Sequence, residues 1–364
     1  MSDPSFESVK AVPKTHRAAV SEHVGDYPAT KYIDTPDASS LAPGKALVRI
    51  VYAGVCHTDV SITLGTGTDQ PVTPIIPGHE GAGYVVAVGP HAAPGPEVVK
   101  VGDRVGIRFV ADICGNCDGC LDGEEESCDH LVISGTNTPG VFQEFIVAPA
   151  SQLTPIPDAV PLSMAAPILC AGLTTYKALL NANLKAGDWV VIPGAGGGLG
   201  HLAVQYALAM NYRVCGIDVG DDKLAMLKGY GIHAFVDFTK ESDVPAAVKR
   251  AVGEKGAKAA VVAAGVIAPY QQALDYLGFR STLVCVGLPK DGKFTVDSNQ
   301  LVVQSSRIVG SSVGTRADAK RALALVELGK VKVELSVRDL DEVGEIFKEL
   351  KGGKVKGRVV VKLF

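Results

Sequence analysis

Short runs of apolar residues, alternating or continuous, dominate the first 170 residues of the chain. Glycine, proline and other turn-forming residues separate these runs, a pattern that favours strands over helices. We therefore expect a mostly β region, with strands in the runs ALVRIVYAGV, GAGYVVAVG, DRVGIRFV and FQEFIVAP, which begin at residues 46, 81, 103 and 142.

The pattern changes near residue 171, where strand-like and helix-like runs begin to alternate. The strand-like runs are WVVIPG (189–194), RVCGID (213–218), AFVDF (234–238), AAVVAA (259–264), TLVCVG (282–287) and RIVGSSV (307–313). Helical periodicity separates them at 199–210, at 221–231, and near 244–252 and 269–277. Such alternation predicts βαβ units around a doubly wound parallel sheet.

The two patterns predict two domains, which a length of 364 residues also favours. We expect the first to comprise residues 1–171 and 315–364, because a helix over 316–328 and the tail GRVVVKLF follow the last strand of the alternating region. The second would comprise residues 172–314. The expected fold class is therefore α/β combined with a mostly β domain.

Composition and charge exclude several classes of protein. Hydrophobic residues make up 47% and charged residues 20% of the chain, as in an ordinary globular protein. A net charge of −4 gives no reason to expect a nucleic-acid or membrane partner. We find no apolar run near the ~18 residues of a membrane span. The start MSDPSFESVK has no apolar signal segment, so we expect a cytoplasmic protein.

Four of the eight cysteines lie close together in the chain. In a chain without a secretory segment, cysteines favour metal sites over disulfides. The spacing is C-x2-C-x2-C-x7-C, from Cys114, Cys117 and Cys120 to Cys128. Four thiolates so placed can wrap one tetrahedral Zn²⁺ with Zn–S bonds of about 2.3 Å. We expect a structural zinc lobe over about 112–130.

A second set of metal-binding residue types is spread more widely. Cys56 lies in GVCHTD, His79 and Glu80 in PGHEG, and Cys170 in ILCAG. Two thiolates and one imidazole favour zinc over Mg²⁺ or Ca²⁺, and three protein ligands leave the fourth position of a catalytic zinc open. Asp59 and Glu80 are expected to support the site, one of them by orienting the His79 ring. Each residue alone could be an ordinary core residue, so the hypothesis depends on their combination.

A glycine-rich turn follows the first strand of the alternating region. It reads Gly194-Ala195-Gly196-Gly197-Gly198-Leu199-Gly200, one residue longer than the G-x-G-x-x-G pattern. Such a turn lets the backbone approach a pyrophosphate at the N-terminus of the next helix. Asp218 follows 18 residues after Gly200 and would bind the adenosine ribose while repelling a 2′-phosphate. This favours NAD over NADP. The alternative to a dinucleotide site is a turn that only caps the end of a strand.

These motifs together resemble the zinc-dependent medium-chain alcohol dehydrogenases, most closely the tetrameric yeast and fungal type. The resemblance rests on GVCHTD, PGHEGAG, the four-cysteine lobe, APILCAGLTTYKAL, GAGGGLGHLAVQYALAM and GRVVV, and it extends from about Val48 onward in the same order. It implies a GroES-like catalytic domain interrupted by a Rossmann NAD-binding domain, two Zn²⁺ per chain and a homotetramer.

The resemblance also implies roles for single residues. Cys56, His79 and Cys170 would bind the catalytic zinc, an established ligand set of alcohol dehydrogenases, with Glu80 as an exchanging ligand. The lobe cysteines would bind the structural zinc, and Thr58 would accept the proton of the alcohol. Around the cofactor, the resemblance implies His57 and Arg358 at the pyrophosphate, Asp218 and Lys223 at the ribose, and the turn 194–200.

Two departures from the family pattern bear on function. Ser61 stands where many members end the proton relay in histidine, and serine is no base near neutral pH. Close yeast-type relatives carry tryptophan at positions that match Gly67 and Phe109, whereas the one tryptophan here is Trp189. We therefore expect a truncated relay and a pocket open to alcohols larger than ethanol.

The predicted function is the interconversion of an alcohol with its aldehyde or ketone by hydride transfer to or from NAD. The alcohol would be primary, and by extension secondary or bulky. One alternative is a zinc enzyme of another alcohol class, such as polyol or cinnamyl-type alcohols. A second is a non-catalytic zinc-binding interaction protein, although acidic residues around the lobe oppose phosphate binding. Zinc-free quinone reductases are disfavoured because all three catalytic ligands are present.

Overall fold

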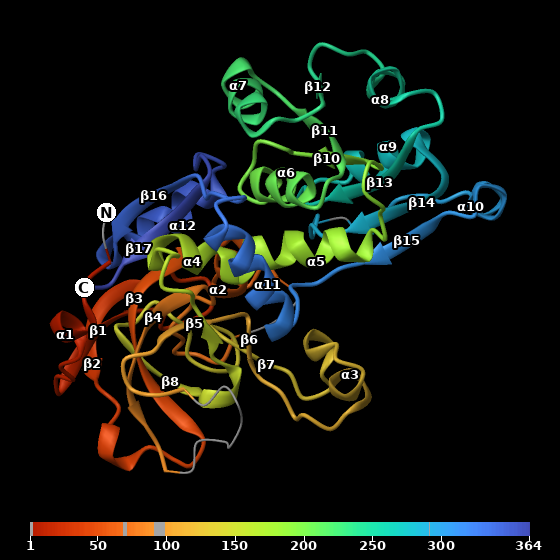
Figure 1. Ribbon diagram of the computed structural model, residues 1–364. Coiled ribbons are helices and arrows are strands. Elements are labelled where there is room, and N and C mark those ends of the chain that lie inside the picture. The colour runs from red at the N-terminus through yellow and green to blue at the C-terminus, as the bar shows by residue number, and fades with distance from the viewer. Residues whose placement is uncertain (1–2, 68–70, 91–98, 291) are drawn as a thin grey trace. The chain divides into compact units, whose positions relative to one another are not determined.

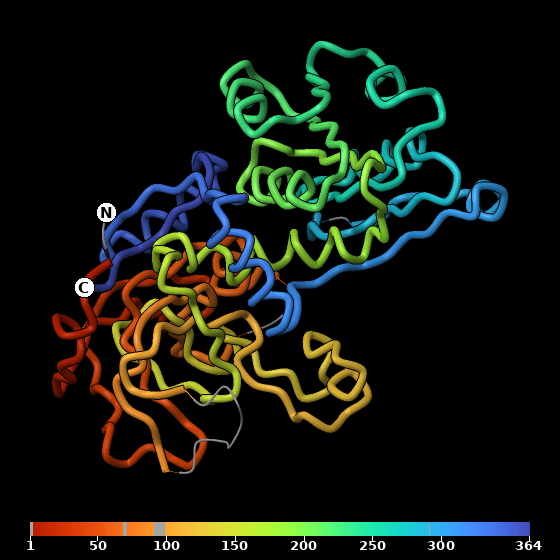
Figure 2. Tube along the Cα trace, in the orientation of Figure 1, coloured from red at the N-terminus to blue at the C-terminus, as the bar shows by residue number. Residues whose placement is uncertain are grey.

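The computed structural model describes residues 3–67, 71–90, 99–290 and 292–364 (Figures 1 and 2). They form two compact units. Unit 1 comprises Met1–Cys170, Gly314–Glu327 and Leu335–Phe364, and unit 2 comprises Ala171–Val313 and Leu328–Glu334. The two ends of the chain therefore fold together, and the middle of the chain forms a unit of its own.

A seven-stranded sheet is the framework of unit 1. Its order is β16-β17-β3-β4-β5-β9, with β8 also paired to β3. All pairs are antiparallel except β16 with β17. The strands are β3 (Lys45–Val55), β4 (Gly81–Val88), β5 (Arg104–Ile107), β8 (Phe145–Pro149), β9 (Thr154–Pro155), β16 (Leu335–Asp339) and β17 (Arg358–Lys362). The central strand β3 is buried over most of its length because it pairs on both edges and packs on both faces.

Shorter elements complete unit 1. Two small antiparallel pairs form from β1 (Thr15–Val20) with β2 (Ala29–Asp34), and from β6 (Val110–Asp112) with β7 (Val132–Ile133). The helices are α1 (Phe6–Val9), α2 (His57–Thr63), α3 (Asp118–Leu121), α4 (Leu162–Pro167), α11 (Arg316–Glu327) and α12 (Val343–Lys351). The amphipathic α12 buries Ile346 and Phe347 in the same apolar core as β3 and β17.

Unit 2 is built on a six-stranded parallel sheet with the order β12-β11-β10-β13-β14-β15. Its strands are β10 (Trp189–Pro193), β11 (Arg213–Asp218), β12 (Ala234–Asp237), β13 (Ala257–Val262), β14 (Leu277–Cys285) and β15 (Arg307–Gly310). Its helices are α5 (Leu173–Asn181), α6 (Gly200–Ala209), α7 (Asp221–Tyr230), α8 (Val244–Val252), α9 (Ala268–Tyr276) and α10 (Ser298–Gln304).

Both faces of this sheet are covered. Val191 packs into one apolar cluster with residues of α8 and α9, while its neighbours Val190 and Ile192 are equally buried outside that cluster. Side chains of a strand alternate between faces, so two layers of helix are required to bury them all. The strand order reverses at β10, and ligands bind at the carboxyl ends of strands at such a reversal.

The predicted combination of a mostly β unit with a doubly wound parallel sheet is confirmed. The run DRVGIRFV, expected to be β, contains strand residues of two elements. It splits into β5 and β6 because the chain bends at Phe109, whose ring packs edge-on against His79 with 5.4 Å between ring centroids. The pattern also gave no indication of β16 and α12, which lie beyond the alternating region.

One helical stretch corrects the expectation about apolar length. Among the described residues, Leu162–Asn181 is long and apolar enough to cross a membrane. Of its most apolar window 89% is buried inside the protein. The core helix of a folded protein passes the same test of length and composition.

Gly83 in β4 generates a test of the unit 1 sheet. A Cβ at this position would lie 1.9 Å from the carbonyl oxygen of Arg49 in β3, which is backbone and has no rotamer to change. We expect Gly83→Ala to lower the free energy of unfolding by about 1–3 kcal/mol, the usual cost of overpacking. Urea unfolding followed by far-UV circular dichroism measures this loss.

Gly229 in α7 provides the control, because a Cβ there meets nothing within 4 Å. Gly229→Ala should leave stability unchanged or raise it by up to about 1 kcal/mol, the helix preference of alanine over glycine. Equal urea midpoints for Gly83→Ala and the unmodified protein would show that β3 and β4 are not this close.

Candidate functional site

Four potential metal ligands from three distant segments meet in unit 1. Donor atoms of Cys56, His79, Glu80 and Cys170 all lie within 4.8 Å of one another, and all four residues are buried. Cys56 directly precedes α2, and His79 and Glu80 directly precede β4. Cys170 lies in a π-helical turn, Ile168–Gly172, that follows α4. The pairing of β3 with β4 brings the first two segments together.

Asp59 connects two of these residues. Its Oδ1 lies 2.6 Å from His79 Nδ1, and its Oδ2 accepts a hydrogen bond from the backbone N–H of Cys56 at 2.9 Å. His79 Nε2 then points into the cluster, 3.2 Å from Cys170 Sγ. A carboxylate on the outer nitrogen of a ligating histidine is the usual device that fixes its tautomer and ring orientation.

The electrostatics favour an anionic sulfur at Cys56 and a neutral thiol at Cys170. The hydrogen bond with Cys170 lowers the pKa of Cys56 well below its ordinary value and raises the pKa of Cys170. Burial disfavours the imidazolium, yet the Asp59 carboxylate raises the pKa of His79 well above its usual value. Burial raises the pKa of Glu80 to about 7, against the attraction of Arg358.

Glu80 contributes a carboxylate with one uncommitted oxygen. Its Oε1 accepts a hydrogen bond from Arg358 Nη2 at 2.5 Å. Its Oε2 is buried and has no hydrogen-bond partner among the described residues. Unpaired buried oxygens are costly and uncommon. Two sulfurs, an imidazole nitrogen and a spare carboxylate oxygen fit a zinc ion, whose preferred ligands are these types.

The four lobe cysteines form a second cluster in unit 1. Cys114, Cys117, Cys120 and Cys128 place their sulfurs within 4.8 Å of one another, on the segment between β6 and β7. Cys128 Sγ accepts hydrogen bonds from the backbone N–H groups of Cys114 and His130. A backbone hydrogen bond from Asp129 lowers the pKa of Cys117 to about 6. Four sulfurs fit a closed, structural zinc site without an open position.

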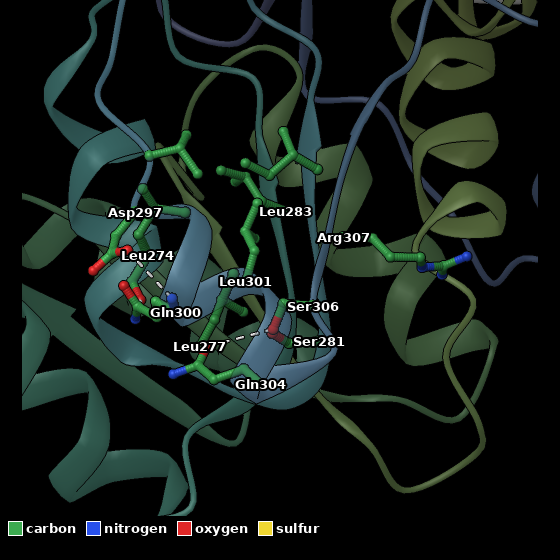
Figure 3. Close-up of a pocket in the computed structure, with 12 residues that line it drawn as sticks. Leu274, Leu277, Ser281, Leu283, Asp297, Gln300, Leu301, Gln304, Ser306 and Arg307 are labelled. Carbon is green, nitrogen blue, oxygen red and sulfur yellow. Dashed lines mark hydrogen bonds between the residues drawn. The ribbon is translucent and has the colours of Figure 1, made fainter.

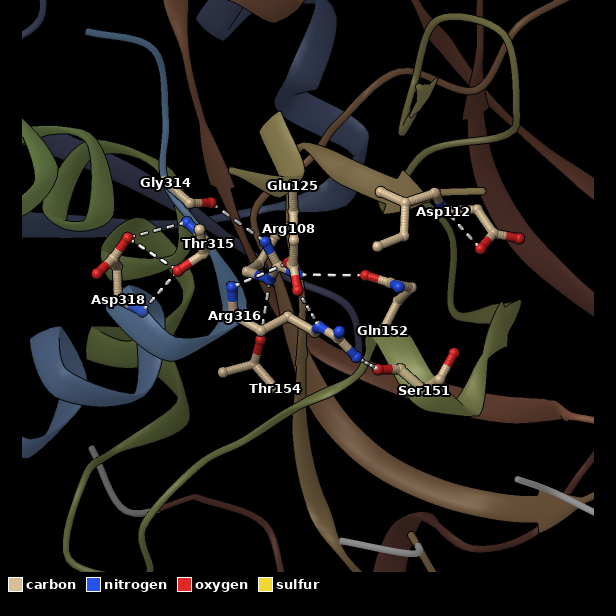
Figure 4. A network of polar contacts seen from close by, with 11 residues as sticks. Arg108, Asp112, Glu125, Ser151, Gln152, Thr154, Gly314, Thr315, Arg316 and Asp318 are labelled. Atoms are coloured by element: carbon tan, nitrogen blue, oxygen red, sulfur yellow. Dashed lines mark hydrogen bonds and ion pairs between the residues drawn. The ribbon is translucent and has the colours of Figure 1, made fainter. Parts of the chain in front are cut away.

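An ionic network around the buried Arg108 attaches this lobe to the rest of unit 1 (Figure 4). Glu125, between the third and fourth cysteines, accepts a hydrogen bond from Arg316 Nε at 2.7 Å and lies 3.7 Å from Arg108 Nη2. Arg108 is almost fully buried and also donates to Thr154 and to the carbonyl of Gly314. Sequence reasoning missed this network, because nothing in the spacing of Arg108, Glu125 and Arg316 indicates that they meet.

The glycine-rich turn of unit 2 lies between β10 and α6. Gly194 has a φ of +72°, and a Cβ at Gly200 would lie 1.9 Å from the Gly194 carbonyl oxygen, so both positions require glycine. Gly196, Gly197, Gly198 and Leu199 complete the turn at the N-terminus of α6. Its N–H groups and helix dipole can hold a phosphate.

Asp218, at the end of β11, is joined to this turn. Its Oδ2 accepts a hydrogen bond from Gly196 N–H at 2.8 Å, and its Oδ1 lies 2.6 Å from Lys223 Nζ. The carboxylate is buried beside the turn and carries the charge that would oppose a 2′-phosphate.

The remaining predicted residues lie around the first cluster or on its elements. Thr58 and Ser61 both lie on α2 and are partly buried. His57 is exposed and its Nε2 lies 3.0 Å from the Leu350 carbonyl oxygen. Arg358, predicted at the pyrophosphate, is buried and bonded to Glu80.

A hollow in unit 2 contains none of the predicted site residues (Figure 3). It lies between α10 and strands β14 and β15, with leucines such as Leu277 and Leu283 and polar groups such as Gln300 on its walls. Polar side chains of the hollow form hydrogen bonds with neighbouring residues: Gln300 donates to the Leu274 carbonyl oxygen, and Arg307 donates to the Thr282 hydroxyl. It has no converging set of reactive groups.

Comparisons with known proteins agree with this arrangement. Residues 42–158 match the family model of the alcohol dehydrogenase GroES-like domain, and residues 198–327 match that of the zinc-binding dehydrogenases. An alcohol dehydrogenase of Schizosaccharomyces pombe is 42% identical over 354 residues, which cover 97% of this chain and 99% of that protein. One of Geobacillus stearothermophilus is 40% identical, covering 95% and 99%.

The fold agrees with solved structures as well. The alcohol dehydrogenase of the archaeon Aeropyrum pernix superposes with a TM-score of 0.83 at 30% identity, covering 95% of this chain and 99% of that chain. A structure described as an NAD-dependent alcohol dehydrogenase gives a TM-score of 0.85 at 27% identity, covering 96% and 100%. With two metal-ligand clusters and a glycine-rich turn in the matching order, the chain belongs to the zinc-dependent medium-chain alcohol dehydrogenase family.

Proposed function

We propose that this protein is an NAD-dependent alcohol dehydrogenase that interconverts a primary alcohol, and by extension secondary or bulky alcohols, with the aldehyde or ketone. The observation that carries the proposal is the buried cluster of Cys56, His79 and Cys170, held by Asp59, in a chain that also has a dinucleotide turn. Residues 1–171 and 315–364 would form the GroES-like catalytic domain, and residues 172–314 the Rossmann domain.

Cys56, His79 and Cys170 would hold the catalytic zinc, and the four lobe cysteines the structural zinc. When bound, zinc would supply Lewis-acid stabilisation of negative charge on the substrate oxygen, and NAD would supply the hydride acceptor. Asp59 would keep the His79 ring oriented toward the metal. Glu80 would stand beside the three ligands as an exchanging fourth donor.

Other residues would bind the cofactor and move the proton. The N–H groups of the turn 194–200 would hold the pyrophosphate, with His57 and Arg358 in support. Asp218 and Lys223 would bind the adenosine ribose. The Thr58 hydroxyl would accept the alcohol proton and pass it toward the nicotinamide ribose. Because Ser61 cannot act as a base near pH 7, the relay would end there and the proton would leave to water.

The partners we propose are small alcohols and aldehydes or ketones. The protein would act as a homotetramer in the cytoplasm, without nucleic-acid or membrane partners. A cinnamyl-type substrate is the second candidate, because Gly67 has no side chain where close relatives carry tryptophan, and a Sorghum bicolor cinnamyl alcohol dehydrogenase shares the fold with a TM-score of 0.83 at 25% identity.

Steady-state NADH formation across a panel of alcohols tests the function directly. We expect turnover with NAD and a kcat/KM at least about a hundredfold lower with NADP, because the Asp218 carboxylate opposes a 2′-phosphate; this ratio corresponds to about 2.8 kcal/mol. Equal use of NADP would contradict the role of Asp218. Absence of turnover with every primary, secondary and cinnamyl-type alcohol would contradict the function itself.

Ser61→His tests the truncated relay. A histidine at this point of α2 could accept the proton above its pKa of about 6.5, so turnover of alcohol should rise severalfold above that pH and show a new inflection there. The matched control is Ser61→Asn, which has similar polarity but does not titrate in this range. The pH profile of kcat measures both, and identical profiles for all three proteins would contradict the idea.

Gly67→Trp tests the substrate range. A Cβ at Gly67 makes only ordinary contacts of 3.5–3.6 Å with Ser61, so a side chain can begin there without displacing the backbone. We expect the kcat/KM for benzyl alcohol relative to ethanol to fall at least tenfold, with little change in Gly67→Ala. A native enzyme that already prefers ethanol strictly over benzyl alcohol would disprove the open pocket.

A further inference from the structure

The Glu80 carboxylate is buried in unit 1 with its two oxygens in different surroundings. Oε1 is fixed by the ion pair with Arg358, whose side chain is 6% exposed. Oε2 has no hydrogen-bond partner among the described residues, and Glu80 belongs to the metal-ligand cluster through one of its carboxylate oxygens. The side chain is therefore anchored at one oxygen and uncommitted at the other.

Gly54, two residues before Cys56 in β3, supplies the space for the uncommitted oxygen. A Cβ built on Gly54 would lie 2.0 Å from Glu80 Oε2, 3.0 Å from its Cδ and 3.1 Å from its Cβ. These are the three nearest atoms, and all belong to the Glu80 side chain. The carboxylate oxygen thus occupies the volume that any other residue at position 54 would fill.

The backbone offers no other reason for glycine at this position. Gly54 is not among the residues with positive φ, and it lies within a regular strand, where glycine is usually destabilising. Its N–H donates to the Glu80 carbonyl oxygen at 2.8 Å, and it pairs with Val360 in β17, the strand that carries Arg358. The same two strands therefore hold Glu80 by its backbone and by its anchored oxygen.

We propose that Gly54 is a positioning residue for Glu80: its missing side chain seats Oε2 toward the catalytic metal as a reserve fourth donor, while Arg358 anchors Oε1. This inference rests on the proposed catalytic metal site. It adds Gly54 as the residue that determines where the carboxylate of the exchanging ligand, Glu80, lies. With a side chain at position 54, the carboxylate must rotate away from its present place. The strain falls on side-chain atoms of Glu80 and not on backbone.

A double-mutant cycle with the cobalt-substituted protein tests the proposal, because the visible spectrum of Co²⁺ reports the ligand field of the catalytic site without any turnover. The cycle compares Gly54→Ala, Glu80→Ala and the double variant, with Gly229→Ala as the control. We expect Gly54→Ala to shift the spectrum and to speed removal of the catalytic metal by a chelator about tenfold or more. In the Glu80→Ala background the same substitution should change the rate less than twofold.

Two results of this cycle would overturn the inference. One is an unchanged spectrum and release rate in Gly54→Ala. The other is an effect of Gly54→Ala that persists in full without Glu80, which would mean that glycine serves packing alone. Loss of both metals from the unmodified protein, or binding of Co²⁺ at the lobe only, would instead refute the proposed function.

Glu80→Asp keeps the test independent of the folding of Gly54→Ala. A carboxylate shorter by one methylene withdraws from the space above Gly54 while the residue at position 54 stays unchanged. The same spectral shift should appear, and a spectrum like that of the unmodified protein would count against the proposal. The release rate of the lobe metal, whose ligands lie on another segment, should stay constant in every variant.

Discussion

The candidate site of unit 1 depends on bringing two thiols and one imidazole to a single buried point. Cys56, His79 and Cys170 are separated by up to 114 residues, yet their donor atoms lie within 4.8 Å of one another and of Glu80. The paired strands β3 and β4 fix two of the segments, and the helical turn after α4 supplies the third. Two of the buried groups have a partner of opposite charge, which offsets the cost of removing them from water. Asp59 balances His79, and Arg358 balances Glu80.

The chemistry of unit 2 depends on backbone geometry. The strand order reverses at β10, and the turn before α6 requires glycine at two positions: Gly194 because of its positive φ, and Gly200 because of the close approach of the Gly194 carbonyl oxygen. Asp218 is fixed by the turn itself, through the N–H of Gly196, so its charge has a defined position before any ligand arrives. The proposed selectivity for NAD over NADP follows from the fixed negative charge of Asp218 more than from the number of contacts to the cofactor.

Motifs and periodicity predicted much of this structure. The spacing of four cysteines predicted the lobe, and alternation of strands and helices predicted the parallel sheet, because both signals are local in the chain. Donor chemistry suggested Cys56, His79 and Cys170 as a second metal site, and the resemblance to alcohol dehydrogenases added Glu80 as an exchanging ligand. Pairings between distant segments, such as Glu125 with Arg108 and Arg316, left no local signal. The role of Gly54 could not be predicted either, because a glycine in a strand does not indicate which side chain fills the space beside it.

Zinc-edge X-ray absorption, combined with the zinc content of the purified protein, tests the central claim most directly. The account predicts two zinc ions per chain, one with four sulfur neighbours and one with two sulfurs, one imidazole nitrogen and a light fourth donor. A single zinc per chain with four sulfur neighbours would contradict it, because Cys56, His79 and Cys170 would then be an ordinary buried polar cluster.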